Sequence, residues 1–150
     1  MGVELSAAEI DAYMLSSRRC ILCVSREGRA PLPLPMWFGW VEGQIVMHTL
    51  LASKKVAQLR ANPQVACLVE SGEHYFSLKA VLAIGHCTVL DDQAEVRRWI
   101  ERINESKPLY RELRPEQWPA HLERFYQQPR AALLVRPHSL TSWDFRKIKH

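Results

Sequence analysis

The sequence has few glycines and no long apolar run, and both shortages exclude common classes of protein. Only 6 of its 150 residues are glycine, and no segment has the form G-x-G-x-x-G, G-x-x-x-x-G-K-S/T or G-x-S-x-G. These patterns mark dinucleotide-binding turns, P-loops and nucleophile elbows. Every apolar run is much shorter than the ~20 residues that cross a membrane, and the N-terminus lacks the basic-then-apolar order of a secretory signal. We therefore expect a cytoplasmic protein with no membrane partner.

The spacing of ligands that a metal site needs is also missing. Cys20 and Cys23 form the single C-x-x-C, inside an apolar run that indicates a buried strand. Residues three apart on a strand point to opposite faces, so this pair cannot easily share a metal or a disulfide. The six histidines show no metal-ligand spacing either. We expect reduced, structural cysteines and no metal site.

The composition is that of an ordinary globular domain. The chain is 47% hydrophobic and 24% charged, which predicts one domain over residues 1–150. Its net charge of +4 favours acidic partners in general. Charge alone does not choose between a phosphate-bearing cofactor, a nucleic acid and an anionic surface.

Periodicity and turn signals predict a mainly β fold with helices outside the sheet. Strands are expected at 20–25, 31–40, 44–49, 64–71, 75–90 and 131–136, with 140–145 as an extension or partner of the last. Helices are expected from the capping box at Ser6 to about Ser17, from Ser53 to Asn62, after Asp91 or Asp92, and from Pro115 through Trp118, Leu122, Phe125 and Tyr126. The long strand 75–90 should bend near Gly85. Six or so antiparallel strands of this kind favour a small closed barrel.

Prolines mark the second predicted strand. Pro31, Pro33 and Pro35 alternate with leucines, so three residues on one side of the strand donate no N–H. Such a strand must lie at the edge of a sheet, or face a ligand instead of a neighbouring strand.

The segment 46–63 carries the clearest functional signal. It indicates a strand, a turn with hydroxyls at Thr49 and Ser53, and a helix that begins with Lys54 and Lys55 and ends at Asn62-Pro63. Cations in a first helical turn are unfavourable by up to roughly 1 kcal/mol each, because the helix start is itself partly positive. A bound phosphate would turn this conflict into a binding site. The alternative is that both lysines are simply solvated on a short surface helix.

These motifs carry a resemblance. Pro35-Met36-Trp37-Phe38, His48-Thr49, Ser53-Lys54-Lys55 and Asn62-Pro63 follow one another in this order, and the chain resembles the pyridoxamine 5'-phosphate oxidase-like superfamily of FMN-binding proteins over nearly its whole length. The resemblance implies a six-stranded antiparallel split β-barrel with peripheral helices. It also implies a homodimer with FMN at the interface.

The resemblance further implies a set of cofactor-binding residues. Those that match the family's strand-end and helix-start motifs, or lie on the second strand or near the positions contributed by the second subunit, are Pro35, Trp37, His48, Thr49, Ser53, Lys54, Lys55, Lys79, Trp143 and Arg146. No catalytic residue can be named. His48 is the best candidate for proton transfer by its location, but a histidine at a strand end is more often a cofactor or core contact.

Departures from the family's pattern bear on the reaction. The true oxidase has a basic second-strand segment and a C-terminal Arg-Leu-His where this chain has Pro35-Met36-Trp37-Phe38 and Trp143-Asp144-Phe145-Arg146, so oxidation of pyridoxamine phosphate is not expected. We expect an FMN-dependent oxidoreductase acting on a small molecule. The alternatives are a deazaflavin-dependent reductase, a non-catalytic flavin or haem carrier, and a basic RNA-binding barrel. The last is disfavoured because such a barrel presents aromatics interleaved with basic residues on an exposed sheet face, whereas the aromatics of this chain cluster in proline-flanked or helical segments.

Overall fold

The computed structural model describes residues 2–107, 120, 124 and 127–149. Its helices are α1 (Ala7–Ser16), α2 (Lys54–Ala61) and α3 (Gln93–Ser106), with short 3-10 turns η1 (Tyr75–Ser77) and η4 (Phe145–Lys147). Its strands are β1 (Arg19–Val24), β2 (Leu32–Trp37), β3 (Gly39–Val41), β4 (Gln44–Leu50), β5 (Gln64–Ser71), β6 (Lys79–Leu90) and β7 (Arg130–Asp144). The predicted helix carrying Trp118, Leu122, Phe125 and Tyr126 lies at residues outside this described part.

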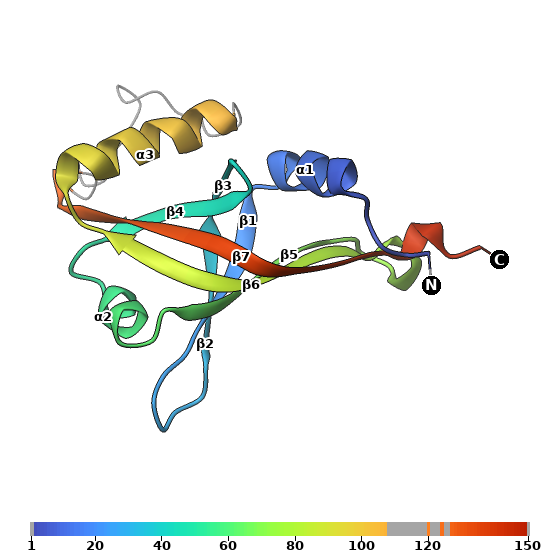
Figure 1. The fold of residues 1–150 in the computed structure, drawn as a ribbon, viewed down its shortest axis with the longest axis horizontal. Helices are drawn as coiled ribbons and strands as arrows, with labels where there is room; N and C mark the ends of the chain where they lie inside the picture. The colour runs from blue at the N-terminus through green and yellow to red at the C-terminus, as the bar shows by residue number, and fades with distance from the viewer. Residues whose placement is uncertain (1, 108–119, 121–123, 125–126, 150) are drawn as a thin grey trace.

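The strands form one antiparallel sheet that curls into a half-barrel (Figure 1). Their order is β2-β1-β5-β6-β7-β4-β3, and no ladder joins the two edge strands, β2 and β3, within the described residues. The barrel is therefore split at this point and not closed. The predicted split-barrel class is confirmed, but the predicted count of six strands is wrong, because the sheet has 7.

The extra strand comes from a break at Phe38. The single strand predicted over 31–40 is two strands, since β2 pairs with β1 whereas Gly39 opens β3 and pairs with Val46 of β4. Burial alternates along β2, but Phe38, Gly39 and Trp40 are buried in succession. The chain changes partner at this point, and a run of apolar letters does not show such a change. In contrast, the predicted segments 131–136 and 140–145 are parts of the single strand β7.

Two expectations about strand geometry are confirmed. The proline-rich β2 is an edge strand, as its missing donors require. The long strand β6 has a register shift against β7 between Ile84 and Gly85. A side chain at Gly85 would collide with the carbonyl of Arg136, so glycine allows the close approach of backbones at this bulge.

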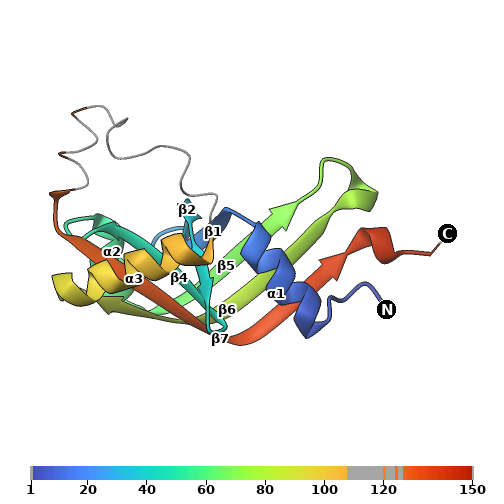
Figure 2. The same ribbon diagram turned by 90° about the horizontal axis from the view of Figure 1, so that it is seen from above.

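The core lies between the inner face of the curled sheet and two of the helices. Tyr13 and Met14 of α1 and Val56 and Leu59 of α2 join the inward side chains of the strands in one buried cluster. Viewed from the side, α1 and α3 lie above the sheet and α2 lies below it (Figure 1), and the view from above shows α3 running across β4 and β7 (Figure 2). None of the described helices combines the length and the apolar character needed to cross a membrane.

The four cysteines are free thiols. Cys20 lies on the buried face of β1, whereas Cys23 lies on the other face and is half-buried, as the strand period predicts. Burial raises the pKa of the Cys87 thiol to about 12. Within the described part of the chain, no three His, Cys, Asp or Glu side chains gather where they could hold a metal ion.

Candidate functional site

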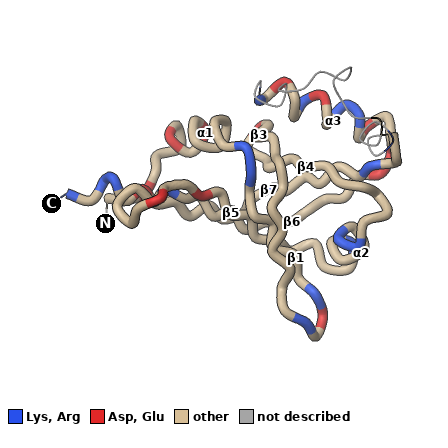
Figure 3. Tube along the Cα trace, turned by 180° about the vertical axis from the view of Figure 1, so that it is seen from behind, with Lys and Arg blue, Asp and Glu red and all other residues tan. Residues whose placement is uncertain are grey.

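The start of α2 has the geometry of an anion site. Ser53 is its N-cap: the backbone is extended there and the Ser53 Oγ accepts from the Lys55 amide at 3.3 Å. The first turn of α2 contains no acidic residue. Figure 3 shows α2 marked by basic residues alone. The N–H groups and the positive end of the helix dipole are therefore not neutralised by the helix itself.

Lys55 is held against the end of β4 by a hydroxyl group. Its Nζ donates to the Oγ1 of Thr49 at 2.9 Å, and Thr49 is itself buried. Burial lowers the pKa of the Lys55 ammonium, because a partly desolvated cation without a counterion is unfavourable. Within the described residues neither Lys55 nor the exposed Lys54 forms an ion pair. No carboxylate of the described residues therefore neutralises these two ammonium groups.

Gln58 adds an unsatisfied acceptor one turn along the same helix. Its Oε1 is buried and has no hydrogen-bond partner among the described residues, a situation that typically costs about 1–3 kcal/mol. A ligand that presents a hydroxyl or a ring N–H at this point would supply the missing donor. Sequence reasoning missed Gln58, although its position three residues after Lys55 puts both on one face of the helix.

His48 lies on the opposite side of β4 from this cluster. Adjacent strand residues point to opposite faces, and the His48 Nδ1 lies 3.1 Å from an Nη1 of the buried Arg130. A guanidinium can only donate, so Nδ1 accepts and we assign the proton of the neutral ring to Nε2. Burial, and then the charge of Arg130, lower the pKa of His48 to about 4. The structure thus separates His48 from Thr49 and Lys55 and keeps its ring neutral at physiological pH.

The partly buried His48 predicts an acid-sensitive stability. Its pKa is about 4 in the fold against an ordinary 6.5, so the unfolded chain binds more protons between these values and stability falls as the pH drops from 6.5 to 4. At about 1.4 kcal/mol per pKa unit the loss is about 3 kcal/mol. Urea unfolding of the chain and of His48→Asn from pH 4 to 7 measures it. If the free energy of unfolding depends on pH equally steeply in His48→Asn, the pH dependence does not come from His48.

Pro35 and Trp37 form a second group of predicted residues. Both are exposed on β2, and both line a groove on the outer face of the sheet together with residues of α1, β1 and β5. Trp37 is 48% exposed, so its ring lies outside the core.

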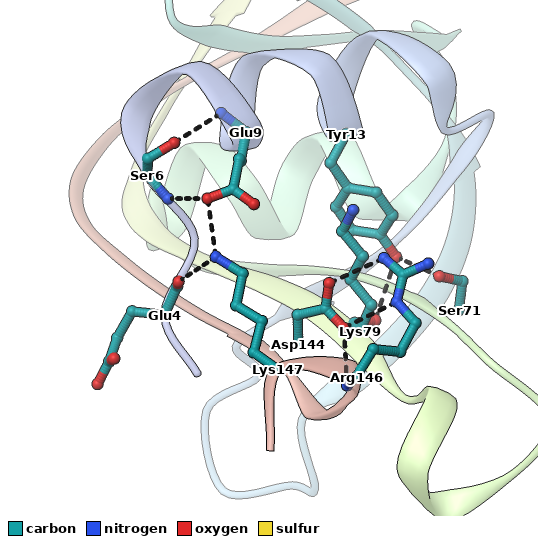
Figure 4. A network of polar contacts seen from close by, with 9 residues as sticks. All are labelled: Glu4, Ser6, Glu9, Tyr13, Ser71, Lys79, Asp144, Arg146 and Lys147. Carbon is teal, nitrogen blue, oxygen red and sulfur yellow. Dashed lines mark hydrogen bonds and ion pairs between the residues drawn. The ribbon is translucent and has the colours of Figure 1, made fainter. Parts of the chain in front are cut away.

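Lys79, Trp143 and Arg146 form a third group at the far end of the sheet. The Lys79 Nζ lies 4.6 Å from the centre of the Tyr13 ring, and Arg146 grips the buried Asp144 with two nitrogens at 2.9 and 2.8 Å (Figure 4). The hydrogen bond from Arg146 lowers the pKa of Asp144. Trp143 is half-buried opposite Ala80 of β6. In one chain this end lies far from α2 (Figure 1), so the predicted residues do not form one site within a single subunit.

The curled antiparallel sheet and its helices define the split-barrel class of proteins. The family described as pyridoxamine 5'-phosphate oxidase matches residues 6–144, and the chain belongs to this family. Among curated proteins no match is found.

Solved structures share the fold at low sequence identity. The conserved hypothetical protein Rv2991 from Mycobacterium tuberculosis is 23% identical with a TM-score of 0.79, over 99% of this chain and 92% of that chain. A FAD-binding protein from Mesorhizobium loti is 19% identical with a TM-score of 0.68, over 93% and 94%. A FAD- and heme-binding protein from Mycobacterium smegmatis is 16% identical with a TM-score of 0.71, over 96% and 73%.

Proposed function

We propose that the protein is an FMN-dependent oxidoreductase that holds the phosphate of its cofactor at the start of α2. The observation that carries the proposal is the pair Lys54 and Lys55, which lacks an ion-pair partner in the described part of the chain and stands at a capped helix start without acidic residues. Phosphate oxygens would accept from these ammonium groups and from the first N–H groups of the helix. Family membership supports the same cofactor class.

The other predicted residues take positioning roles in this proposal. Thr49 fixes the ammonium of Lys55, and Gln58 accepts from a hydroxyl or a ring N–H of the cofactor. Pro35 and Trp37 on the edge strand β2 border the split of the barrel. His48 stabilises the end of β4 through its hydrogen bond with Arg130, on the side of the strand opposite to Lys55. When bound, the flavin ring supplies the hydride or electron transfer, and the protein binds and orients it.

We infer that the working form is a homodimer with the cofactor at the interface. Lys79, Trp143 and Arg146 lie at the opposite end of the sheet from α2 (Figure 1), so they can reach a cofactor bound at α2 only if it belongs to a second subunit. The resemblance noted above implies this arrangement. The single domain over 1–150 and the cytoplasmic location stay predictions, as do the small-molecule substrate and the absence of a nucleic-acid partner.

A flavin or haem carrier without catalysis is the second candidate. The structurally similar proteins from Mesorhizobium loti and Mycobacterium smegmatis are described by what they bind, FAD or FAD and heme. A deazaflavin coenzyme is the close variant of the first candidate, because its phosphate would use the same two lysines.

A titration with paired ligands tests the proposal. FMN and riboflavin differ only in the phosphate, so we expect the chain to bind FMN at least about tenfold more tightly, the value of one charge-assisted contact. Quenching of flavin fluorescence measures both affinities. Equal affinities for FMN and riboflavin would contradict the proposal that the two lysines bind the phosphate. If the chain binds none of FMN, FAD and a phosphorylated deazaflavin, the proposed function is wrong. Turnover of the bound flavin with NADH or NADPH and a second acceptor would separate an oxidoreductase from a carrier.

A further inference from the structure

A groove on the outer face of the sheet is a second candidate binding site, and none of the described residues that line it comes from α2. The groove has a volume of about 840 Å³ and lies where β1, β2 and β5 run beside the segment that joins α1 to β1. Small-molecule sites typically have volumes of about 300–1,000 Å³. The groove is thus large enough for a ligand of its own.

The floor of the groove is apolar. Pro35 of β2 lies opposite Ile21 of β1, and Ile21 lies opposite Leu68 of β5, so the three side chains form one row across three strands. Trp37 stands two residues further along β2 on the same face, opposite Arg19, and is 48% exposed. An exposed indole beside such a row offers a flat surface on which a planar or branched hydrocarbon can pack.

The rim of the groove carries two guanidinium groups. Arg18 and Arg19 are both exposed and line it, and among the described lining residues Glu70 supplies the carboxylate. Arg19 and Glu70 form no ion pair with each other or with other described residues. Figure 3 shows the basic stretch between α1 and β1. A guanidinium in this position is suited to a carboxylate or phosphate, which it can bind through two parallel hydrogen bonds.

Hydroxyl groups close one end of the groove. The Tyr13 hydroxyl lies 2.7 Å from the Ser71 Oγ and donates to the Lys79 carbonyl at 3.1 Å. Because the Tyr13 proton is used in this way, Ser71 donates to Tyr13 and keeps lone pairs that a ligand donor can reach. Figure 4 shows this pair beside Lys79 and Arg146, so the groove adjoins the third group of predicted residues.

We propose that this groove binds a small organic anion with a flat apolar body. The anionic group rests on the Arg18–Arg19 pair, and the apolar body lies on Pro35 and Ile21 beside Trp37. Pro35 and Trp37 are also among the residues that the family resemblance assigns to the cofactor, so we place this anion beside the flavin, as its substrate. That last step alone rests on the proposed function.

A pair of matched probes tests the groove without any flavin. The probe 8-anilinonaphthalene-1-sulfonate is an aromatic anion, and N-phenyl-1-naphthylamine is the same ring system without the sulfonate. We expect Arg18→Gln with Arg19→Gln to weaken binding of the sulfonate at least about tenfold and to leave the neutral probe unchanged. Trp37→Ala should weaken both probes. Replacing the exposed Arg97 and Arg98 of α3 by glutamine removes the same charge elsewhere and should change neither affinity.

Several results would overturn the groove assignment. Equal loss of both probes in the arginine variant, or loss of neither, would show that the guanidiniums do not select an anion. Binding of both probes to a monomer but not to a dimer would show that a second copy of the chain covers the groove. Competition by octanoate and by octyl phosphate then shows which anionic group is preferred. If saturating FMN binds but leaves the affinity for the sulfonate probe unchanged, the groove does not serve the flavin, whereas failure of FMN to bind would leave the probe results standing.

Discussion

Replacing Lys54 and Lys55 by alanine is expected to weaken FMN binding by at least about tenfold, because a charge-assisted contact is worth about 1.5–3 kcal/mol. Lys55 should account for most of the loss, since its ammonium is partly desolvated and held in place by Thr49. The exposed Lys54 has the smaller effect, because water screens it. Flavin fluorescence titration of the two single variants and of the double variant measures how much FMN affinity each lysine contributes.

Two controls make this result specific. Affinity for riboflavin should be the same in all variants, because it has no phosphate for the lysines to hold. Arg60→Ala removes a positive charge from the last turn of the same helix, where Arg60 pairs with Asp91 at 2.7 Å, and should leave FMN binding unchanged. Removing cations from a helix start does not destabilise the helix, so the variants should fold. Unchanged FMN affinity in the double variant would refute the anchor.

A second large effect is expected from Lys107, whose side chain is buried. Its Nζ donates to the carbonyl of Ser17 and lies 3.2 Å from the centre of the Phe38 ring. Burial lowers its pKa from 10.5 to about 7, while the nearby Cys20 opposes this shift. At about 1.4 kcal/mol per pKa unit, the charged form destabilises the fold below pH 7 by on the order of 5 kcal/mol relative to the neutral form.

The direction of the pH effect follows from the protons bound. Between pH 7 and 10.5 the unfolded lysine keeps a proton that the folded one has lost, so stability rises with pH through this window. About 2 kcal/mol of the rise should fall between pH 7 and 9, before ionisation of the buried thiols acts in the opposite direction. Urea unfolding should show this rise in the wild type and in Lys149→Met, but not in Lys107→Met. A rise that persists in Lys107→Met would refute the assignment.

Local patterns in the sequence predicted the elements well. The capping box at Ser6, the N-cap at Ser53 and the stop at Asn62 are each the product of a few neighbouring residues, and the structure has all three. Asp92 and not Asp91 caps α3, a choice that local pattern left open. The edge position of β2 was also predictable, because missing N–H groups are a property of the proline residues alone.

Features that depend on which strands meet could not be predicted. The break at Phe38 arises because the chain leaves β1 for β4, and the apolar letters on either side are alike. His48 and Thr49 are neighbours in sequence, yet opposite faces and the buried Arg130 separate their surroundings. The groove joins Tyr13, Trp37 and Glu70, which only the order of the strands brings together. The position of Lys54 and Lys55 at a helix start could be predicted, because a helix start is defined by adjacent residues.

The prolines of β2 also limit how two copies of the chain can associate. Pro33 and Pro35 lie on an edge strand that is paired with β1 along its whole length on one side. Their ring nitrogens therefore face the unpaired side. A further strand that paired there would need N–H donors, which proline lacks. The unpaired edge of β2 therefore cannot pair with a strand of another molecule and extend the sheet into a filament. Chains can come together on this side only through their side-chain surfaces, which favours closed pairs over open-ended stacks.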